Sequence, residues 1–133
     1  MITEIRSKNK SRNKLFALLL DVSDIKEGTF AATDPSWSLQ MLMMKRKCGH
    51  IVRKHMHKKI LKSTKQPMEA IVVVRGAIQA SIFDRYGELI AKKSVSSGQC
   101  LLIIDGAHEV KVKKNALMYA FKDGPYREDK VML

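Results

Sequence analysis

Three histidines lie among lysines and an arginine, with no acidic residue nearby, in the stretch GHIVRKHMHKK, residues 49–59. On an extended strand, residues two apart point to the same side, so His55 and His57 would share a face with Arg53. Two neutral imidazoles on one face form a natural pair of ligands for a transition metal. The same stretch can also be interpreted as a basic stripe that attracts a polyanion. A metal site and a polyanion-binding segment are therefore the two alternatives.

Two further residues have the chemistry to complete a metal site. Glu69 begins a predicted strand on its apolar, inward face, where a buried carboxylate needs a partner that a metal would supply. His108 follows the turn residues DGA at the start of another predicted strand. The predicted ligand set is three imidazoles and one carboxylate, from His55, His57, Glu69 and His108. Each residue considered alone could instead have a purely structural role. Glu69 could pair with a neighbouring cation, and His108 could be an ordinary turn residue.

Short segments with strand character must position these side chains. They follow one another from residue 38 onward, at residues 38–45, 68–76, 77–84, 88–95, 100–104, 108–113 and 116–121. Turn residues separate them, and no helix-period stretch of useful length intervenes. This spacing predicts an antiparallel sandwich or barrel. Residues 13–21 fit a short helix or a strand.

The length of 133 residues is that of a single domain. We expect residues 1–37 to form a basic, partly mobile extension, with a tail over the first dozen, and residues 38–133 to form the folded domain. The longest apolar runs are far shorter than a membrane span, and no secretory cleavage site follows them. Cys48 and Cys100 are too few for a disulfide framework. We expect a cytoplasmic protein with reduced thiols and no membrane partner.

Positive charge is concentrated in the middle of the chain. The formal net charge is +12, and residues 45–65 contain nine lysines and arginines and no acid. This local field favours an anionic partner such as a phosphate ester, a nucleotide or a nucleic acid. Residues 44–66 contain no aromatic residue other than histidine, which weighs against nucleic acid without removing it as an alternative. The alternative is that these basic residues only keep the protein soluble.

Residues 49–76 resemble the first motif of the cupin superfamily. In that motif a glycine precedes H-x-H by five residues, a glutamate follows, and a second glycine stands six residues beyond the glutamate. The matching residues are Gly49, His55, His57, Glu69 and Gly76. Eleven residues separate the second histidine from the glutamate, so an enlarged loop replaces the usual short spacer.

Two later segments extend the resemblance. Residues 98–108 resemble the second cupin motif, with Ile104 in place of its proline and His108 one residue early. The ending FKDGPYREDK, residues 121–130, is similar to that of the WbuC-like proteins of surface-polysaccharide gene clusters. The corresponding positions are Lys122, Gly124, Pro125, Tyr126, Asp129 and Lys130, and Ala120 stands where those proteins often have glutamate.

The resemblance covers roughly residues 38–133 and implies an all-β double-stranded β-helix, the cupin jelly roll, with a short N-terminal helix or strand before it. It implies that His55, His57, Glu69 and His108 hold a divalent transition metal: Fe, Mn, Ni, Co or Zn. Four protein ligands leave one or two positions of an octahedral ion for water or substrate. Because neutral imidazole is the binding form, we expect metal to be lost below about pH 6.

The expected function is that of a metal-binding cupin acting on a carbohydrate-like or phosphorylated anionic small molecule in sugar or polysaccharide metabolism. Isomerisation or epimerisation, or Fe-dependent oxidation, would make it an enzyme. Tyr126 and His50 are candidates for proton transfer, and Arg53, Lys62 and Lys122 for substrate binding. The alternatives are a non-catalytic ligand-binding or sensor cupin and a basic nucleic-acid-binding module.

The outward face of the strand at residues 68–76 carries Ala70, Val72 and Val74. It is too apolar to remain in water, so another sheet edge, the N-terminal segment or a second subunit must cover it. Small cupins are commonly dimers, and we expect a homodimer.

Overall fold

The fold comes from a computed structural model that describes residues 1–9 and 12–133, and within these ranges the chain is all-β, as predicted. The strands are β1 (Ile2–Arg6), β2 (Leu15–Asp21), β3 (Gly28–Ala31), β4 (Leu42–Lys45), β5 (Glu69–Phe83), β6 (Leu89–Ser96), β7 (Gln99–Ile103) and β8 (Ala107–Lys122). The described ranges include no helix that could cross a membrane. Lys10 and Ser11, part of the expected tail, lie outside the described residues.

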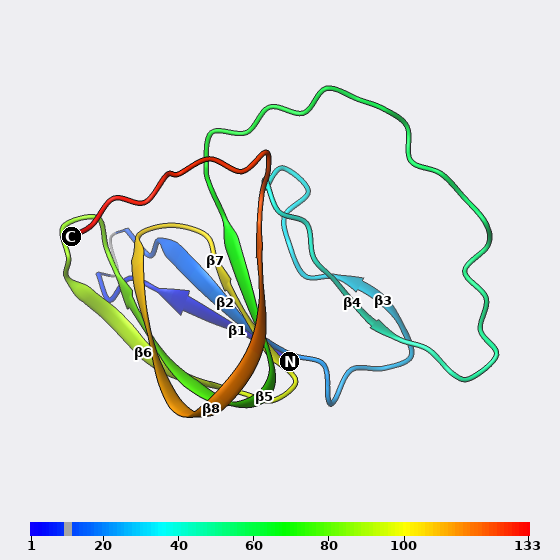
Figure 1. Ribbon diagram of the computed structural model, residues 1–133, viewed down its shortest axis with the longest axis horizontal. Helices are drawn as coiled ribbons and strands as arrows, with labels where there is room; N and C mark the ends of the chain where they lie inside the picture. Colours follow the sequence, from blue (N-terminus) through cyan, green and yellow to red (C-terminus); the bar gives the residue numbers. More distant parts are fainter. Residues whose placement is uncertain (10–11) are drawn as a thin grey trace.

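Six strands form one antiparallel sheet that curls into a half-barrel of the jelly-roll type (Figure 1). Its order is β1-β2-β7-β5-β6, and β8 pairs with the other edge of β5 along its whole length. Strands β3 and β4 form a separate hairpin outside the curled sheet. Strands β5 and β8 are each longer than predicted, because the segments expected as separate strands on either side of Gly76 and of residues 114–115 are continuous.

The long β5-β8 ladder bends at a glycine. Gly76 has a φ of +85°, in the left-handed region that favours glycine, and the pairing register shifts on both sides of it. A Cβ at this position would collide with the carbonyl oxygen of Asn115 on β8. The close backbone approach and the register shifts let both strands turn sharply, as bulges do in barrels. Gly76 is therefore a cause of the curl.

Two apolar clusters pack on the two faces of the sheet. The inner cluster fills the half-barrel and includes Val73, Ile78, Ile82, Val95 and Leu101, all fully buried. The outer cluster contains Leu20, Met43, Ala70 and Leu102, and segments around the β3-β4 hairpin cover it. The outward face of the strand around Ala70 is thus covered over much of its area from within the chain, while Val74 stays 48% exposed.

The N-terminal segment is part of this sheet, contrary to the expected extension over residues 1–37. Strand β1 pairs with β2, and β2 pairs with β7 in the middle of the sheet. Ile5 is 2% exposed and Phe16 is 4% exposed, both in the inner cluster. The polar sequence around β1 hides this role because only one of its side chains is buried, and the strand depends on its neighbour for pairing.

We predict that Ile5→Ala lowers the free energy of unfolding by about 2–4 kcal/mol, because it removes apolar contacts from the inner cluster and leaves a cavity. The matched control is Ile2→Ala, the same change on the same strand at a side chain that is 44% exposed. Urea unfolding followed by circular dichroism measures both. Equal, small effects of the two changes would show that β1 is a dispensable extension.

Candidate functional site

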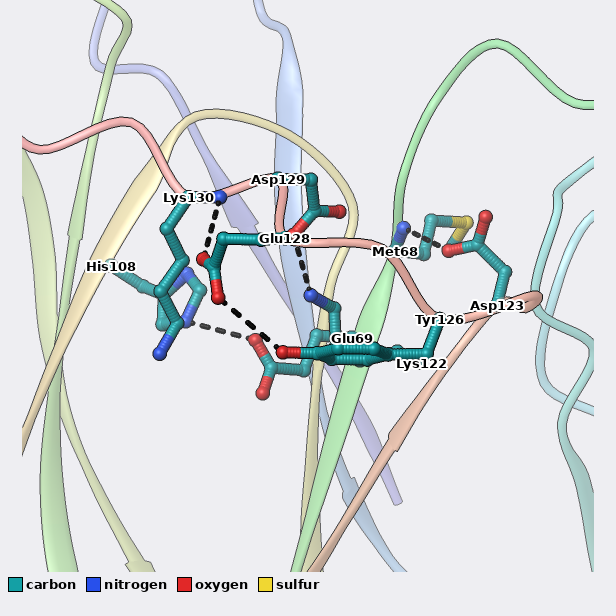
Figure 2. A network of polar contacts seen from close by, with 9 residues as sticks. All are labelled: Met68, Glu69, His108, Lys122, Asp123, Tyr126, Glu128, Asp129 and Lys130. Carbon is teal, nitrogen blue, oxygen red and sulfur yellow. Dashed lines mark hydrogen bonds and ion pairs between the residues drawn. The ribbon is translucent and has the colours of Figure 1, made fainter.

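Glu69 and His108 meet at the open end of the half-barrel. Glu69 is the first residue of β5 and pairs with Lys122, whereas His108 on β8 pairs with Ile82 at the far end of β5. A straight ladder would separate these two ends by on the order of 40 Å. The curl instead brings His108 Nε2 within 3.1 Å of Glu69 Oε2 (Figure 2). The fold thus confines two predicted metal ligands to one place.

A turn tied to β2 holds His108 in position. The backbone N–H groups of Ile104 and Asp105 both donate to the carbonyl oxygen of Phe16. Lys14 forms an ion pair with Asp105, and Gly106 follows with a φ of +78°. A Cβ at Gly106 would collide with the carbonyl oxygen of Phe83, so glycine is needed where β8 begins beside the end of β5.

The electrostatic surroundings of Glu69 favour its ionised form. The hydrogen bond with His108 lowers the pKa of the Glu69 carboxyl below its ordinary value, against the opposing effect of partial burial. Electrostatic attraction to His108, when its ring is protonated, and to the ammonium groups of Lys122 and Lys130 lowers it further. An ionised carboxylate beside an imidazole supplies one oxygen and one nitrogen donor, the mixed set that suits a borderline divalent metal.

A C-terminal strap, residues 123–130, crosses the open end of the half-barrel above this pair (Figure 1, Figure 2). Lys122 Nζ lies 2.8 Å from Asp129 Oδ1, which fastens the strap to the end of β8. The Tyr126 hydroxyl donates to Glu128 Oε2 over 3.4 Å. At the base of the strap, Asp123 Oδ1 accepts from the backbone N–H of Met68, next to Glu69. The strap therefore forms a polar roof over the Glu69-His108 pair.

The loop of residues 46–68 carries the other two predicted ligands away from that pair. It contains no strand, although the sequence predicted a strand around His55 and His57, and its residues are exposed up to residue 67. It extends outward from the body between β4 and β5 (Figure 1). Within residues 1–9 and 12–133, no group of three or more histidine, cysteine, aspartate or glutamate side chains lies close enough to hold a metal. Nothing in the local sequence pattern indicates that these alternating residues lack a pairing strand.

The two loop histidines do lie beside each other. Their ring centroids are 5.2 Å apart in an edge-to-face arrangement. His55 Nδ1 donates to the carbonyl oxygen of Arg53 over 2.8 Å, because a carbonyl can only accept. In the neutral ring this bond fixes the proton on Nδ1 and leaves the Nε2 lone pair available, which is how metal-ligating histidines are commonly oriented.

The remaining predicted residues lie on the loop, on the strap or at the end of β8. His50, Arg53 and Lys62 are exposed on the loop, and Tyr126 is 80% exposed on the strap. Lys122 is in register with Glu69 and so lies at the open end of the half-barrel. The acids Glu128 and Asp129 join this site without having been predicted as site residues; the charged sequence REDK directly after GPY was the available signal.

Both cysteines are free, as predicted. Cys48 is exposed, and Cys100 is buried in the outer cluster. Burial raises the pKa of the Cys100 thiol to about 11, so this group stays protonated at neutral pH and is a poor nucleophile or ligand.

We predict a specific pH dependence from Glu69. Because its pKa is lower in the folded chain than the ordinary value of 4.5, its contribution to stability is present above that value and is lost as pH falls through the folded pKa. The stability difference between the parent protein and Glu69→Gln should therefore shrink between pH 6 and pH 3. Urea unfolding at several pH values measures it. A difference that stays constant over this range would contradict the ionic contact.

Comparison of the chain with protein-family models, with curated proteins and with solved structures finds no match.

Proposed function

We propose that the protein is a metal-binding cupin that acts on an anionic, carbohydrate-like small molecule. The observation that carries the proposal is the contact between Glu69 and His108, two residues of the cupin motifs from opposite ends of the β5-β8 ladder. Local sequence does not require these side chains to meet. Their convergence at the mouth of a half-barrel is the arrangement that a metal site inside a jelly roll needs.

The donor chemistry of the chain fits a divalent transition metal. Glu69 and His108 would supply an oxygen and a nitrogen from the sheet, and His55 and His57 two nitrogens from the loop. Glu69 follows His57 by twelve positions, and a chain of that length reaches on the order of 40 Å, so the loop is long enough to bring the histidines to the mouth. We propose that the loop of residues 46–68 closes on the half-barrel when metal binds.

A bound metal supplies Lewis-acid polarisation of a carbonyl oxygen, which favours isomerisation or epimerisation. Fe-dependent oxidation is a second metal-dependent reaction that we propose for such a site. For the proton transfer we propose Tyr126, whose hydroxyl lies in the strap above Glu69, and His50, which the loop would carry to the mouth. Ala120 pairs with Ile71 and stands where the WbuC-like proteins often have glutamate, so we propose that Tyr126 and His50 take the acid-base role without a carboxylate at this position.

Charge supports an anionic substrate. Lys122 lies at the mouth, and Arg53 and Lys62 are on the loop that would close over it. Guanidinium and ammonium groups are the usual partners of phosphate and carboxylate oxygens. We propose a cytoplasmic location, which fits two free cysteines, and a role in sugar or polysaccharide metabolism.

Calorimetric titration of a sugar phosphate into the protein tests this proposal, with and without one equivalent of Mn²⁺. A binding event that appears only with the metal and is lost in Glu69→Ala supports it. Identical titration curves with and without Mn²⁺ would contradict a metal-dependent function.

A homodimer is also proposed, through the outer face of β8. Leu117, Tyr119 and Phe121 alternate along this edge strand and are 54%, 64% and 52% exposed. An edge strand with an apolar face is prone to pair with another chain. We predict that the double change Tyr119→Lys, Phe121→Lys gives a monomer at micromolar concentration in sedimentation equilibrium. A parent protein that is already monomeric would contradict this proposal.

A further inference from the structure

A second hollow lies on the outer face of the sheet, away from the Glu69-His108 pair. Trp37, Ser38, Ser63, Thr64, Lys65 and Gln66 line it, and we call it the Trp37 cleft. Its volume of about 360 Å³ falls in the range of small-molecule sites. Met68, just before β5, also lines the cleft and belongs to the outer cluster, whereas Glu69, the first residue of β5, lies at the mouth of the half-barrel.

Hydrogen bonds between distant segments hold the walls of the cleft. The Ser38 hydroxyl donates to the carbonyl oxygen of Gln66 over 2.8 Å. The Gln66 side-chain amide donates to the carbonyl oxygen of Ile104 over 2.9 Å, at the end of β7. Trp37 is partly buried and packs against the outer apolar cluster. In the metal-free arrangement of the loop the cleft is therefore formed before any ligand arrives, which reduces the entropy cost of binding.

Three hydrogen-bond donors at the cleft have no partner. In the described part of the chain, no hydrogen bond or ion pair uses the Trp37 indole N–H, the Ser63 hydroxyl or the Lys65 ammonium. No acidic side chain lines the cleft. The cleft thus offers one aromatic surface, a positive charge and several hydroxyl groups, a combination that favours a ligand with many oxygen acceptors and a negative charge.

We infer that the Trp37 cleft binds an anionic monosaccharide. The C–H face of a pyranose ring carries a partial positive charge and packs on the electron-rich face of the Trp37 indole. The carboxylate or phosphate of the sugar pairs with Lys65, and its hydroxyl oxygens accept from Ser63. The site does not involve the proposed metal ligands, so it binds its ligand in the absence of metal.

The fluorescence of Trp37 tests this inference directly, because Trp37 is the only tryptophan in the chain. The protein is titrated in EDTA, which removes any effect of the proposed metal site, with glucose 1-phosphate and with glucuronate. We expect a saturable change in emission with both. Glucose and inorganic phosphate, at the same concentrations, should give none. No saturation with either anionic sugar, or an equal response to inorganic phosphate alone, would overturn the inference.

Two lysine variants locate the binding. Lys65→Gln should weaken the affinity for both anionic sugars about tenfold, the usual effect of removing a charge-assisted hydrogen bond. Lys59→Gln, a change at another exposed lysine of the same loop that does not line the cleft, should leave the affinity unchanged. Equal weakening by the two changes would overturn the inference, because it would assign the binding to the general positive field of the loop.

A change at Trp37 tests whether the indole ring itself contributes to binding. Trp37→Phe keeps an aromatic ring against the outer cluster, and ligand-observed NMR replaces fluorescence as the readout. We expect binding of glucuronate to weaken at least fivefold in a variant whose circular dichroism matches the parent. Unchanged binding in such a variant would overturn the role of the indole. If the variant does not fold, the comparison of Lys65→Gln with Lys59→Gln still decides the inference.

Discussion

Gly76→Ala is expected to lower the free energy of unfolding by about 3 kcal/mol or more. Two costs combine. A non-glycine residue at a φ of +85° is strained, and the new Cβ collides with the carbonyl oxygen of Asn115. The collision involves backbone on both sides, so β5 and β8 must move apart at the bend.

Gly87→Ala is the matched control for this change. Gly87 has a φ of +89°, but a Cβ added there would meet no atom within 4 Å. It should therefore show only the conformational cost, about 1 kcal/mol. Urea unfolding of both variants measures the difference, which isolates the close approach of β5 and β8. Equal destabilisation by the two changes would contradict the account of the bend.

The effect of Gly76→Ala should extend to the site. The curl that Gly76 permits brings His108 to Glu69 from the other end of the ladder. In the fraction of this variant that stays folded, we expect weaker metal binding although no ligand has changed. Retention of full metal affinity would show that the ladder curls without this glycine.

The second large effect concerns metal affinity. We predict that His57→Ala lowers the affinity for Co²⁺ at least about 100-fold, because losing a ligand should exceed the 10- to 100-fold cost of losing a residue that only orients one. Glu69→Ala should act similarly from the other side of the proposed centre. Both residues are at least partly exposed, so neither change should unfold the protein. Competition with a chromophoric chelator measures the affinities.

Controls exist for each ligand. His50→Ala removes a histidine of the same loop outside the His55-x-His57 pair, and Glu109→Ala removes an exposed carboxylate next to His108 on β8. Neither should change Co²⁺ affinity more than about threefold, a range of well under 1 kcal/mol. If His50→Ala weakens binding as much as His57→Ala, the loop binds metal through any histidine and the proposed centre is wrong.

The sequence predicts the all-β class well, because alternating segments and turn residues define most strands locally. It predicts the face of Glu69 for the same reason: the period of two places this residue with Ile71 and Val73, which are both in the inner cluster. It does not reveal that two pairs of short segments are two long, bent strands. The segments on the two sides of Gly76 look like separate strands, and only the close approach of Gly76 to Asn115 across the ladder shows that one strand bends there.

Strand β1 and the loop of residues 46–68 show two opposite ways in which local sequence fails to predict a strand. Strand β1 has one buried residue, Ile5, and too little apolar pattern to be predicted without its partner β2. The segment around His55 and His57 alternates like a strand, yet it pairs with no strand in the described part of the chain, and it stays exposed. Local pattern determines which face a side chain would take, whereas long-range pairing determines whether the strand forms.

Metal content after purification is the most direct measurement of whether the chain has a metal centre. Plasma mass spectrometry is applied to tag-free parent protein and to His57→Ala, both before and after incubation with Mn²⁺, Fe²⁺, Co²⁺, Ni²⁺ and Zn²⁺ followed by desalting. We predict about one transition metal per chain in the parent and little in the variant. A parent chain that retains no metal after reconstitution would contradict the account and leave Glu69 and His108 as a structural ion pair.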